Sequence, residues 1–489
     1  MAFVDEVYGR HPEKGNMKRL QQFLAGVIAL AQAACALQAP APSVNAGAPA
    51  QWQAPLPPQL PPQLPPQLPH RGQLTDMTLW WRQQGDPLLV QLIVSSQTVS
   101  PTIAAAHARI AQARAARIAA GSALLPSLAA AASATRTSQQ SRLPLGTSAQ
   151  TALQASWELD LFSANRAGRD AAQARLAGAQ ALWHEARVSV AAEVANQYYS
   201  LRSCAQLLAV AQLDANSRAD TARLTRLSAD AGFQAPATAA LARASAAEGK
   251  SRATLQRALC ALDLKALVAL TAWPEPELRQ QLDANAAVAP PALAIAALPA
   301  QVLSQRPDLF NAEREVAAAS FEVGAAHAQR YPRLSLSGSV GVANFRSAGV
   351  NTGLDTWSIG PVSLSLPLFD GGRRSANLEA AQARYQQAVV NYRASARLAV
   401  REVEEALVNL DSTAARSADA RVAFEGYHAA FGAADSRYRN GLASLLELED
   451  ARRTRLAAEN ALITLQRERS AAWIALYRAA GGGWTAHTE

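Results

Sequence analysis

Apolar residues alternate with small polar ones in four short stretches of the chain. This period of two predicts strands at 126–137 and 147–162, and again at 332–345 and 356–369. In the third stretch, one face carries serines and a glycine and the other carries Leu334, Leu336, Val340 and Val342. Such a two-faced strand suits a barrel with lipid outside and water inside, and it equally suits the solvent-facing side of a soluble sheet.

Two much longer stretches have the composition of helices. Residues 166–230 and 373–439 are rich in Ala and Arg and contain no proline over more than sixty residues each. At 1.5 Å per residue, each predicts a helix about 100 Å long. Gly371 and Gly372 separate the last strand from the second long helix and mark a strand-to-helix junction. Helices of this length do not fit a globular domain, so we expect them to pack side by side as a coiled-coil-like tube.

The whole pattern occurs twice. Residues 100–128 align without gaps on 306–334, an offset of 206 positions, and Gly232 aligns with Gly441, an offset of 209. These two glycines mark hairpin turns where the long helices fold back. Each copy contains one helix, two strands and two long helices. The predicted division is a first repeat at 75–290, a second repeat at 291–484 and a tail at 485–489.

Four strands are too few for a membrane barrel. About eight strands are the practical minimum, and open sheet edges are not tolerated in lipid. If the strands face lipid, copies of the chain must therefore pool them. The predicted fold is mixed, a membrane β-barrel joined to a long α-helical coiled-coil barrel, with four strands from each protomer.

Composition excludes several classes of function. The chain has 489 residues and a net charge of +8, but its arginines are scattered along the helices, which argues against a nucleic-acid binder. The three cysteines lack zinc or redox spacing, and the seven histidines are dispersed. We find no nucleophile elbow, Walker loop or dinucleotide fingerprint. The sequence therefore predicts no enzyme activity, no catalytic residues, no metal site and no cofactor.

The N-terminal region reads as an export signal. Residues 17–34 begin with Met, Lys and Arg and continue with an apolar run and small residues, whereas 1–16 read as an extension that is not native. The apolar run is shorter than the ~20 residues of a membrane span. Cys35 then fits a lipoprotein cleavage site, at which its thiol is acylated, although Gln32 replaces the usual leucine. Ordinary cleavage after Ala31 or Ala33 is the alternative.

A proline-rich segment follows the cysteine. P-P-Q-L occurs three times within 55–73, which excludes helix and predicts an extended polyproline spacer at ~3.1 Å per residue. We interpret 35–74 as a tether between a lipid anchor and the folded body.

These features resemble the outer membrane factor family, the TolC-like channels, and within it the NodT-type efflux lipoproteins. The resemblance spans about 75–484 and rests most strongly on RPDLFNAEREVAAA (306–319), YPRLSLSGSVG (331–341), GPVSLSLPLFDGGRR (360–374), SRYRNGLASLLELEDARR (436–453) and ALYRAAGGGW (475–484). In the first repeat, WELDLF (157–162) and ARIAQARA (108–115) agree as well.

The resemblance implies a homotrimer with a twelve-stranded outer membrane barrel and a twelve-helix periplasmic tunnel. Such a protein is lipid-anchored in the outer membrane, in contact with its lipids. It is the passive exit duct of a tripartite pump for drugs or other small molecules, with a periplasmic adaptor and an inner-membrane RND-type transporter. The alternatives are the duct of a type I protein secretion system and a soluble periplasmic coiled-coil scaffold.

The resemblance also implies sites near the hairpin tips. Acidic residues that narrow the tunnel and favour cations map onto Glu447 and Asp450, which lie three apart on one helix face. The alternative is that both are solvated charges at a helix end. The family's closing latch of tyrosine, arginine and aspartate maps onto Tyr438, Ala443 and Thr238, so two of its members are replaced. Tyr438 and Thr238 could still form a hydrogen bond.

Counting back from the first tip places two cysteines at one level. A turn near Phe233 puts the antiparallel partner of Cys204 near residue 262, two positions from Cys260. A disulfide would then be allowed in the oxidising periplasm, provided that the Cα atoms approach within about 7 Å. The alternative is two buried free thiols that act as small apolar residues.

Overall fold

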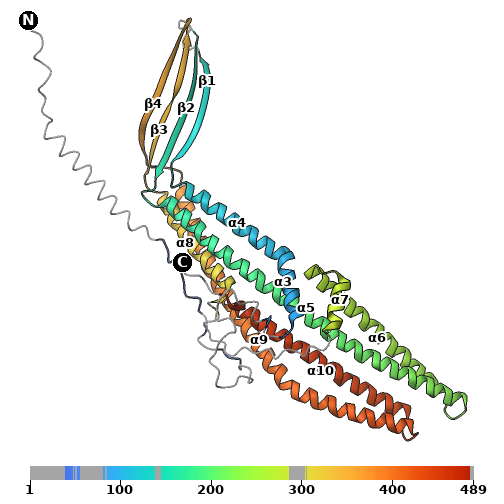
Figure 1. Ribbon diagram of the computed structural model, residues 1–489. Coiled ribbons are helices and arrows are strands. Elements are labelled where there is room, and N and C mark those ends of the chain that lie inside the picture. The colour runs from blue at the N-terminus through green and yellow to red at the C-terminus, as the bar shows by residue number, and fades with distance from the viewer. Residues whose placement is uncertain are drawn as a thin grey trace, which may run out of the picture. The chain divides into compact units, whose positions relative to one another are not determined.

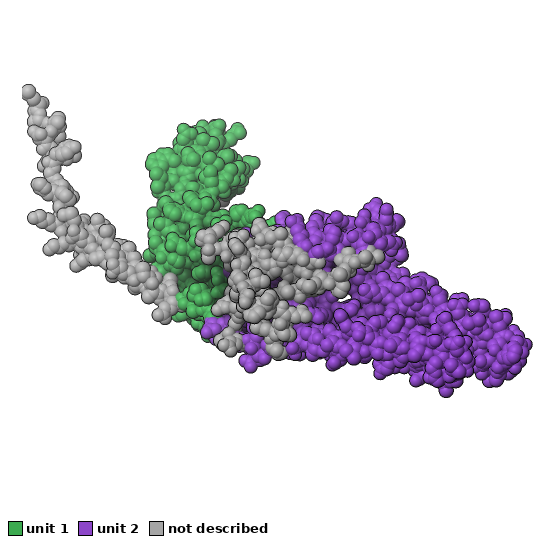
Figure 2. Space-filling model, turned by 60° about the horizontal axis from the view of Figure 1, so that its bottom comes forward, with its two compact units in different colours: residues 1–44, 111–177, 313–390 green, residues 45–110, 178–312, 391–489 purple. Residues whose placement is uncertain are grey.

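The computed structural model describes residues 39–47, 49, 52–54, 81–82, 85–137, 145–285, 303 and 305–484 (Figure 1). The predictions for 1–16, 17–34, Cys35, most of the tether and the tail at 485–489 lie outside these residues. The chain forms two compact units, each built from three separate segments (Figure 2). The first unit contains 111–177 and 313–390, and the second contains 45–110, 178–312 and 391–489.

The order of elements repeats as the sequence predicts. In each half a helix precedes two strands, and a 67-residue helix and a shorter one follow them. The first half consists of α3 (Pro87–Val99), α4 (Pro101–Ser122), β1 (Ser127–Thr137), β2 (Gly146–Leu159), α5 (Ala164–Asp230), α6 (Pro236–Thr271) and α7 (Glu275–Ala284). The second half consists of α8 (Pro307–Ala328), β3 (Arg333–Ser347), β4 (Val350–Ser365), α9 (Arg373–Arg439) and α10 (Leu445–Ala479). The described chain is therefore mostly helical with a single four-stranded sheet.

The strands form one antiparallel sheet in the order β1-β2-β3-β4. β4 begins at Val350, six residues before the predicted start, and ends at Ser365. The reason is the turn at Ala348 and Gly349, whose φ angles of 50° and 80° allow a two-residue hairpin. Ser347 consequently pairs with Val350, and the ladder begins directly at the turn.

The two faces of the sheet differ in polarity, as the alternation predicted. Directly paired residues share a face, and one face carries the row Leu153, Val340 and Trp357. The adjacent row on the other face is Gln154, Ser339 and Ser358. Leu336 pairs with Val362 and Gly338 pairs with Ile359, so β4 has one more residue than β3 in this interval. This bulge keeps Val362 and Ile359 on the same, apolar face of the sheet. The extra residue lies at Gly360–Pro361, where proline's missing donor costs least.

An aspartate caps each long helix where it leaves the sheet. Asp370 accepts hydrogen bonds from the backbone N–H groups of Gly372 and Arg374, at 3.1 and 3.2 Å. Gly371 and Gly372 have φ angles of 64° and 86°, which a residue with a Cβ adopts only under strain. The predicted junction thus turns the chain sharply from β4 into α9. In the first half, Asp160 plays the same role for the start of α5.

The main core lies in the second unit, where α3 packs among the long helices. Its largest fully buried side chains include Trp81, Leu89, Tyr198 and Tyr477. Among the described residues no single helix is long and apolar enough to cross a membrane; α3 and α4 together have the length and composition, but they are bent by 48° at their junction.

The described part of the predicted tether is docked on the helices. Ser320 on α8 and Tyr385 on α9 donate hydrogen bonds to the carbonyl oxygens of Pro40 and Ala41, at 2.5 and 2.9 Å. In the second unit, the carboxylate of Glu404 accepts from the backbone N–H groups of residues 53 and 54, both at 2.7 Å. Residues 39–41 and 53–54 are therefore fixed to the body, whereas the sequence predicted a spacer throughout 35–74.

Candidate functional site

The two helical hairpins of the second unit turn at the predicted glycines. Gly232 connects α5 to α6 with φ of 79°, and Gly441 connects α9 to α10 with φ of 73°. The next residue in each turn donates its backbone N–H to a carbonyl five residues earlier, as in a Schellman motif. These next residues, Phe233 and Leu442, are exposed. Ser444 then caps α10 by accepting the N–H of Glu447 at 3.2 Å.

The two acids assigned to the aperture lie in the first turns of α10. Arg437 at the end of α9 donates to Glu447 at 2.6 Å, and Asp450 pairs with Arg453 one turn along its own helix. All four side chains are exposed. Exposed ion pairs contribute about 0–1 kcal/mol and are screened by salt, so these arginines reduce the local negative charge without removing it.

Tyr438 contacts a different threonine from the expected one. Its hydroxyl lies 2.9 Å from Oγ1 of Thr225 on α5. Thr225 donates its own hydroxyl proton to the carbonyl of Thr221, so Tyr438 is the donor in the shared bond. The expected pairing with Thr238 is therefore wrong. Tyr438 lies in the last turn of α9 and packs against a small buried cluster of Ala242 on α6 with Leu445 and Leu448 on α10.

A buried ionic cluster lies close to Tyr438, and sequence reasoning missed it. Arg218 on α5 donates to Asp214 at 2.8 Å and pairs with Glu449 on α10. Glu449 also pairs with Arg452, whose side chain is 0% exposed. Ser245 on α6 contacts both Arg218 and Glu449. The cluster consequently joins the first hairpin to the last helix of the second repeat.

Local packing makes room for these charges. An added Cβ at Gly249 on α6 would lie 2.8 Å from Cδ of Arg218, so only glycine leaves space for this arginine. Arg452 donates to the hydroxyls of Ser217 and Thr221 on α5, at 3.1 and 3.2 Å. Burial lowers the pKa of Arg452, while Glu449 opposes that shift. The guanidinium groups are thus desolvated and dependent on their acidic partners.

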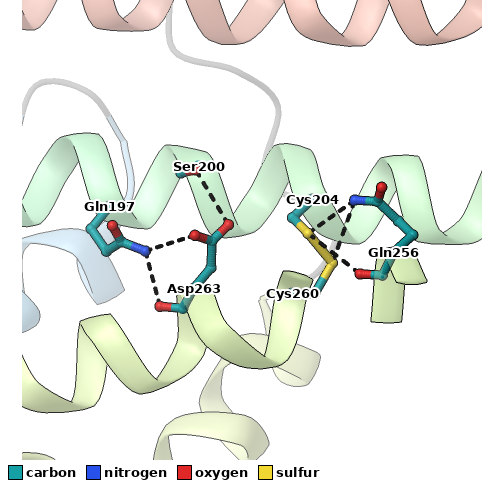
Figure 3. The surroundings of a disulfide bond; sticks show 6 residues. All are labelled: Gln197, Ser200, Cys204, Gln256, Cys260 and Asp263. Atoms are coloured by element: carbon teal, nitrogen blue, oxygen red, sulfur yellow. Dashed lines mark hydrogen bonds between the residues drawn. A yellow bond between two sulfur atoms is a disulfide. The ribbon is translucent and has the colours of Figure 1, made fainter. Parts of the chain in front are cut away.

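The two cysteines form a disulfide between α5 and α6 (Figure 3). The Cα atoms of Cys204 and Cys260 lie 5.4 Å apart, and Gln256 donates to Sγ of Cys204 at 3.1 Å. One turn or more further from the tip, Gln197 donates to the side chain of Asp263 at 3.1 Å. Of the two alternatives left by the sequence, the structure therefore has the bridge.

The family described as outer membrane efflux protein matches residues 92–272 and 298–482, in both repeats. The chain is 30% identical over 339 residues to the solvent efflux pump outer membrane protein SrpC of Pseudomonas putida, covering 69% of this chain and 71% of that protein. It is 29% identical over 421 residues to nodulation protein T of Rhizobium leguminosarum, covering 84% and 85% respectively. The solved outer-membrane channel OprN matches with a TM-score of 0.75 and 28% identity, covering 90% of this chain and 100% of that chain.

Proposed function

The chain belongs to the outer membrane efflux protein family and is an outer membrane channel, and we propose that it works as a homotrimer, the passive exit duct of a tripartite pump. The observation that carries the trimer is the sheet. It has four strands, and among the described residues the outer edges of β1 and β4 pair with no other strand. Unpaired edges are not tolerated in lipid, and three copies supply the twelve strands that the family resemblance implies.

The two faces of the sheet support the same proposal. Trp357 and Ile359 are 76% and 86% exposed in one protomer, on a face that also carries Val340 and Leu153. A row of large apolar side chains is stable when it faces lipid. The opposite face, with Gln154 and Ser339, then borders an aqueous lumen that continues into a tunnel of the long helices.

The partners follow from the relatives. The relative SrpC is named as the outer membrane protein of a solvent efflux pump. We infer that the present chain likewise receives drugs or other small molecules from an inner-membrane RND-type pump through a periplasmic adaptor, which would meet the exposed hairpin tips at Phe233 and Leu442. Type I secretion is the second candidate within the same fold. A soluble scaffold would leave the apolar face of the sheet in water, which its row of large apolar side chains argues against.

We assign the tip roles on the same basis. Glu447 and Asp450 would form rings of negative charge in the trimer, and Tyr438 would hold the tip through Thr225. The charge of such rings attracts cations to the aperture.

The docked segment supports Cys35 as a lipid anchor. Ala39 lies against Gly324 on α8, near the end of the helix that leads into β3. Four residues span at most about 14 Å, so an anchor at Cys35 would be within that distance of Ala39, and hence near the part of α8 that leads into β3. Cys35→Ser should abolish palmitate labelling and slow signal processing. A mature variant of unchanged mass and mobility would contradict the anchor.

One set of measurements tests the function. The purified protein should run as a heat-sensitive trimer, conduct ions in planar bilayers and cross-link through its tips to an adaptor. Its deletion should raise intracellular accumulation of a pump substrate. A non-conducting protein in the soluble periplasmic fraction would support the scaffold. Loss of secretion of one exported protein, with unchanged drug accumulation, would support the type I duct.

A further inference from the structure

The polarity of the sheet inverts at the end that lies furthest from the helices. Along most of its length the polar face carries small or hydrogen-bonding side chains, for example Gln154, Gly341 and Ser339. At the level of the β3–β4 turn, the opposite face stops being apolar and carries Arg136, Asn344, Arg346, Asn351 and Asp355. The outward apolar band therefore ends before the strands do, and their last residues extend beyond the lipid in the proposed channel.

On the polar face, the large apolar residues of the described strands gather at this same end. They are Phe345, Val350 and Leu354, and we refer to them as the apolar collar. Phe345 pairs with Thr352 and Ser148, which places it on the face of Gln154. Leu354 pairs with Ala343, two residues before Phe345, so Phe345 and Leu354 are diagonal neighbours on adjacent strands.

The burial of Ala343 shows that this pair is packed. Ala343 is 6% exposed, although it lies on an open face of a four-stranded sheet. Its flanking neighbours on that face are Phe345 and Leu354, which remain 47% and 50% exposed. Lipid explains exposed apolar side chains on the opposite face, but it does not reach this one. The collar needs another explanation.

We propose that the collar lines the outer mouth of the lumen and makes it selective, hindering charged solutes more than apolar ones of the same size. This inference rests on the proposed trimeric channel. Twelve strands spaced about 4.8 Å apart and tilted by about 40° enclose a backbone circle roughly 24 Å across. Three collars narrow such an opening without filling it. The β3–β4 turn has only two residues, so it adds no loop of its own beside the collar.

The physical basis is the loss of hydrogen-bond partners at the wall. Below the collar, serine and glutamine side chains can solvate a passing charge. Phe345 and Leu354 offer no donor or acceptor, so an ion close to the wall loses part of its hydration without replacement. An apolar solute loses nothing at the same place and gains contact with the ring and the methyl groups.

Site-directed labelling from outside the cell tests the collar without passing the tip. In intact cells, Gln154→Cys below the collar is exposed to two maleimides of equal size, one sulfonated and one uncharged, both too bulky for general porins. Asn351→Cys on the outer surface gives the reference rate. The chain without an added cysteine gives the background, since Cys204 and Cys260 are bridged.

We expect the sulfonated probe to label Gln154→Cys more slowly than the uncharged probe, relative to their rates at Asn351→Cys. Adding Phe345→Ser and Leu354→Ser should speed sulfonated labelling about tenfold, the effect of a barrier change comparable to one apolar side chain. Val342→Ser, at a nearby level on the lipid-facing side, should leave it unchanged. Heat-sensitive trimers on gels check that each variant assembles.

Equal relative rates of the two probes at Gln154→Cys would overturn the collar, even if the serine variants failed to assemble. Unchanged sulfonated labelling in an assembled serine variant would overturn it as well. Both results would leave the channel itself intact. If Gln154→Cys reacted with neither probe while Asn351→Cys reacted with both, the polar face would not border an open lumen, and the proposed channel would fail together with the collar.

Discussion

Glu449 is the residue whose removal should perturb the tip region most. Its carboxylate pairs with Arg218 and Arg452, which are 5% and 0% exposed. Glu449→Ala leaves two buried guanidinium groups with Asp214 as the one acid still within ion-pair distance of both. Removing one partner of a buried ion pair costs about 3–5 kcal/mol, because the other charge stays desolvated.

This cost should appear as local opening of α10 rather than as global unfolding. A loss of about 3–5 kcal/mol raises the population of an open state by roughly 10²-fold to 4 × 10³-fold. Native-state hydrogen exchange of the amides near Glu449, in detergent-solubilised trimers, measures that population directly. Glu449→Gln keeps the size and one acceptor oxygen, so its effect should be smaller.

Glu468→Ala is the matched control, because its pair with Arg416 is exposed and on the same helix α10. An exposed pair is worth about 0–1 kcal/mol, so exchange near Glu468 should rise less than about fivefold. Gly249→Ala tests the cluster from the other side by displacing Arg218. If Glu449→Ala changed exchange no more than Glu468→Ala does, the cluster would not hold α10 to the first hairpin.

Three other predictions follow from the same unit. Replacing Cys204 and Cys260 by serine should lower the thermal midpoint, since a loop of this length contributes about 4 kcal/mol on the chain-entropy model. Two reactive thiols from this pair in the denatured, unreduced wild type would contradict the bridge. Exchanging Glu447 and Asp450 for Gln and Asn should reduce cation preference, and an unmoved reversal potential under a salt gradient would make both acids ordinary surface charges. Burial, and to a smaller extent a neighbouring aspartate, raises the pKa of the Glu185 carboxyl. The stability that this carboxyl contributes is therefore present at low pH and is lost as the pH rises through its raised folded-state pKa. Glu185→Gln should therefore gain thermal stability over wild type near pH 8 and little near pH 4, and an equal gain at both would argue against this assignment.

The long elements were predictable because their signals are long. The composition of 373–439 predicted a helix that the structure has at Arg373–Arg439, and the alternation predicted the two faces of the sheet. The start of β4 was misplaced because Ala348–Gly349 lacks the Asn-Gly or Asp-Gly signature of a tight hairpin. Ser347, Gly349 and Gly353 would have indicated only a loop here, not a two-residue reversal.

The tip contacts were less predictable, because they depend on burial and on partners distant in sequence. Asp214 and Arg218, four apart on a helix, look in the sequence like the exposed pair Glu248 and Arg252. Only packing shows that the first pair is buried beneath α10. Gly249 was the available signal, since a glycine within a long helix commonly marks a close approach of another group.

The duplication fixes the backbone of both hairpins, yet it does not duplicate the disulfide. At the offset of 209 that relates the two tips, Cys204 and Cys260 correspond to Thr413 and Arg469. The first hairpin is therefore linked covalently between its arms, whereas the corresponding positions of the second cannot form such a link.

The ionic cluster is not duplicated either. At the same offset, Asp214 and Arg218 on α5 correspond to Ala423 and Tyr427 on α9, which cannot form an ion pair. Glu449 on α10 corresponds to an alanine on α6, so the acid that links two arginines is missing there as well. In the proposed trimer, the second repeat of one protomer also meets the first repeat of the next. That contact cannot reproduce the cluster, so the buried charges strengthen only the contact within a protomer. We therefore expect the two hairpins of one protomer to move together, and neighbouring protomers to move more readily relative to each other.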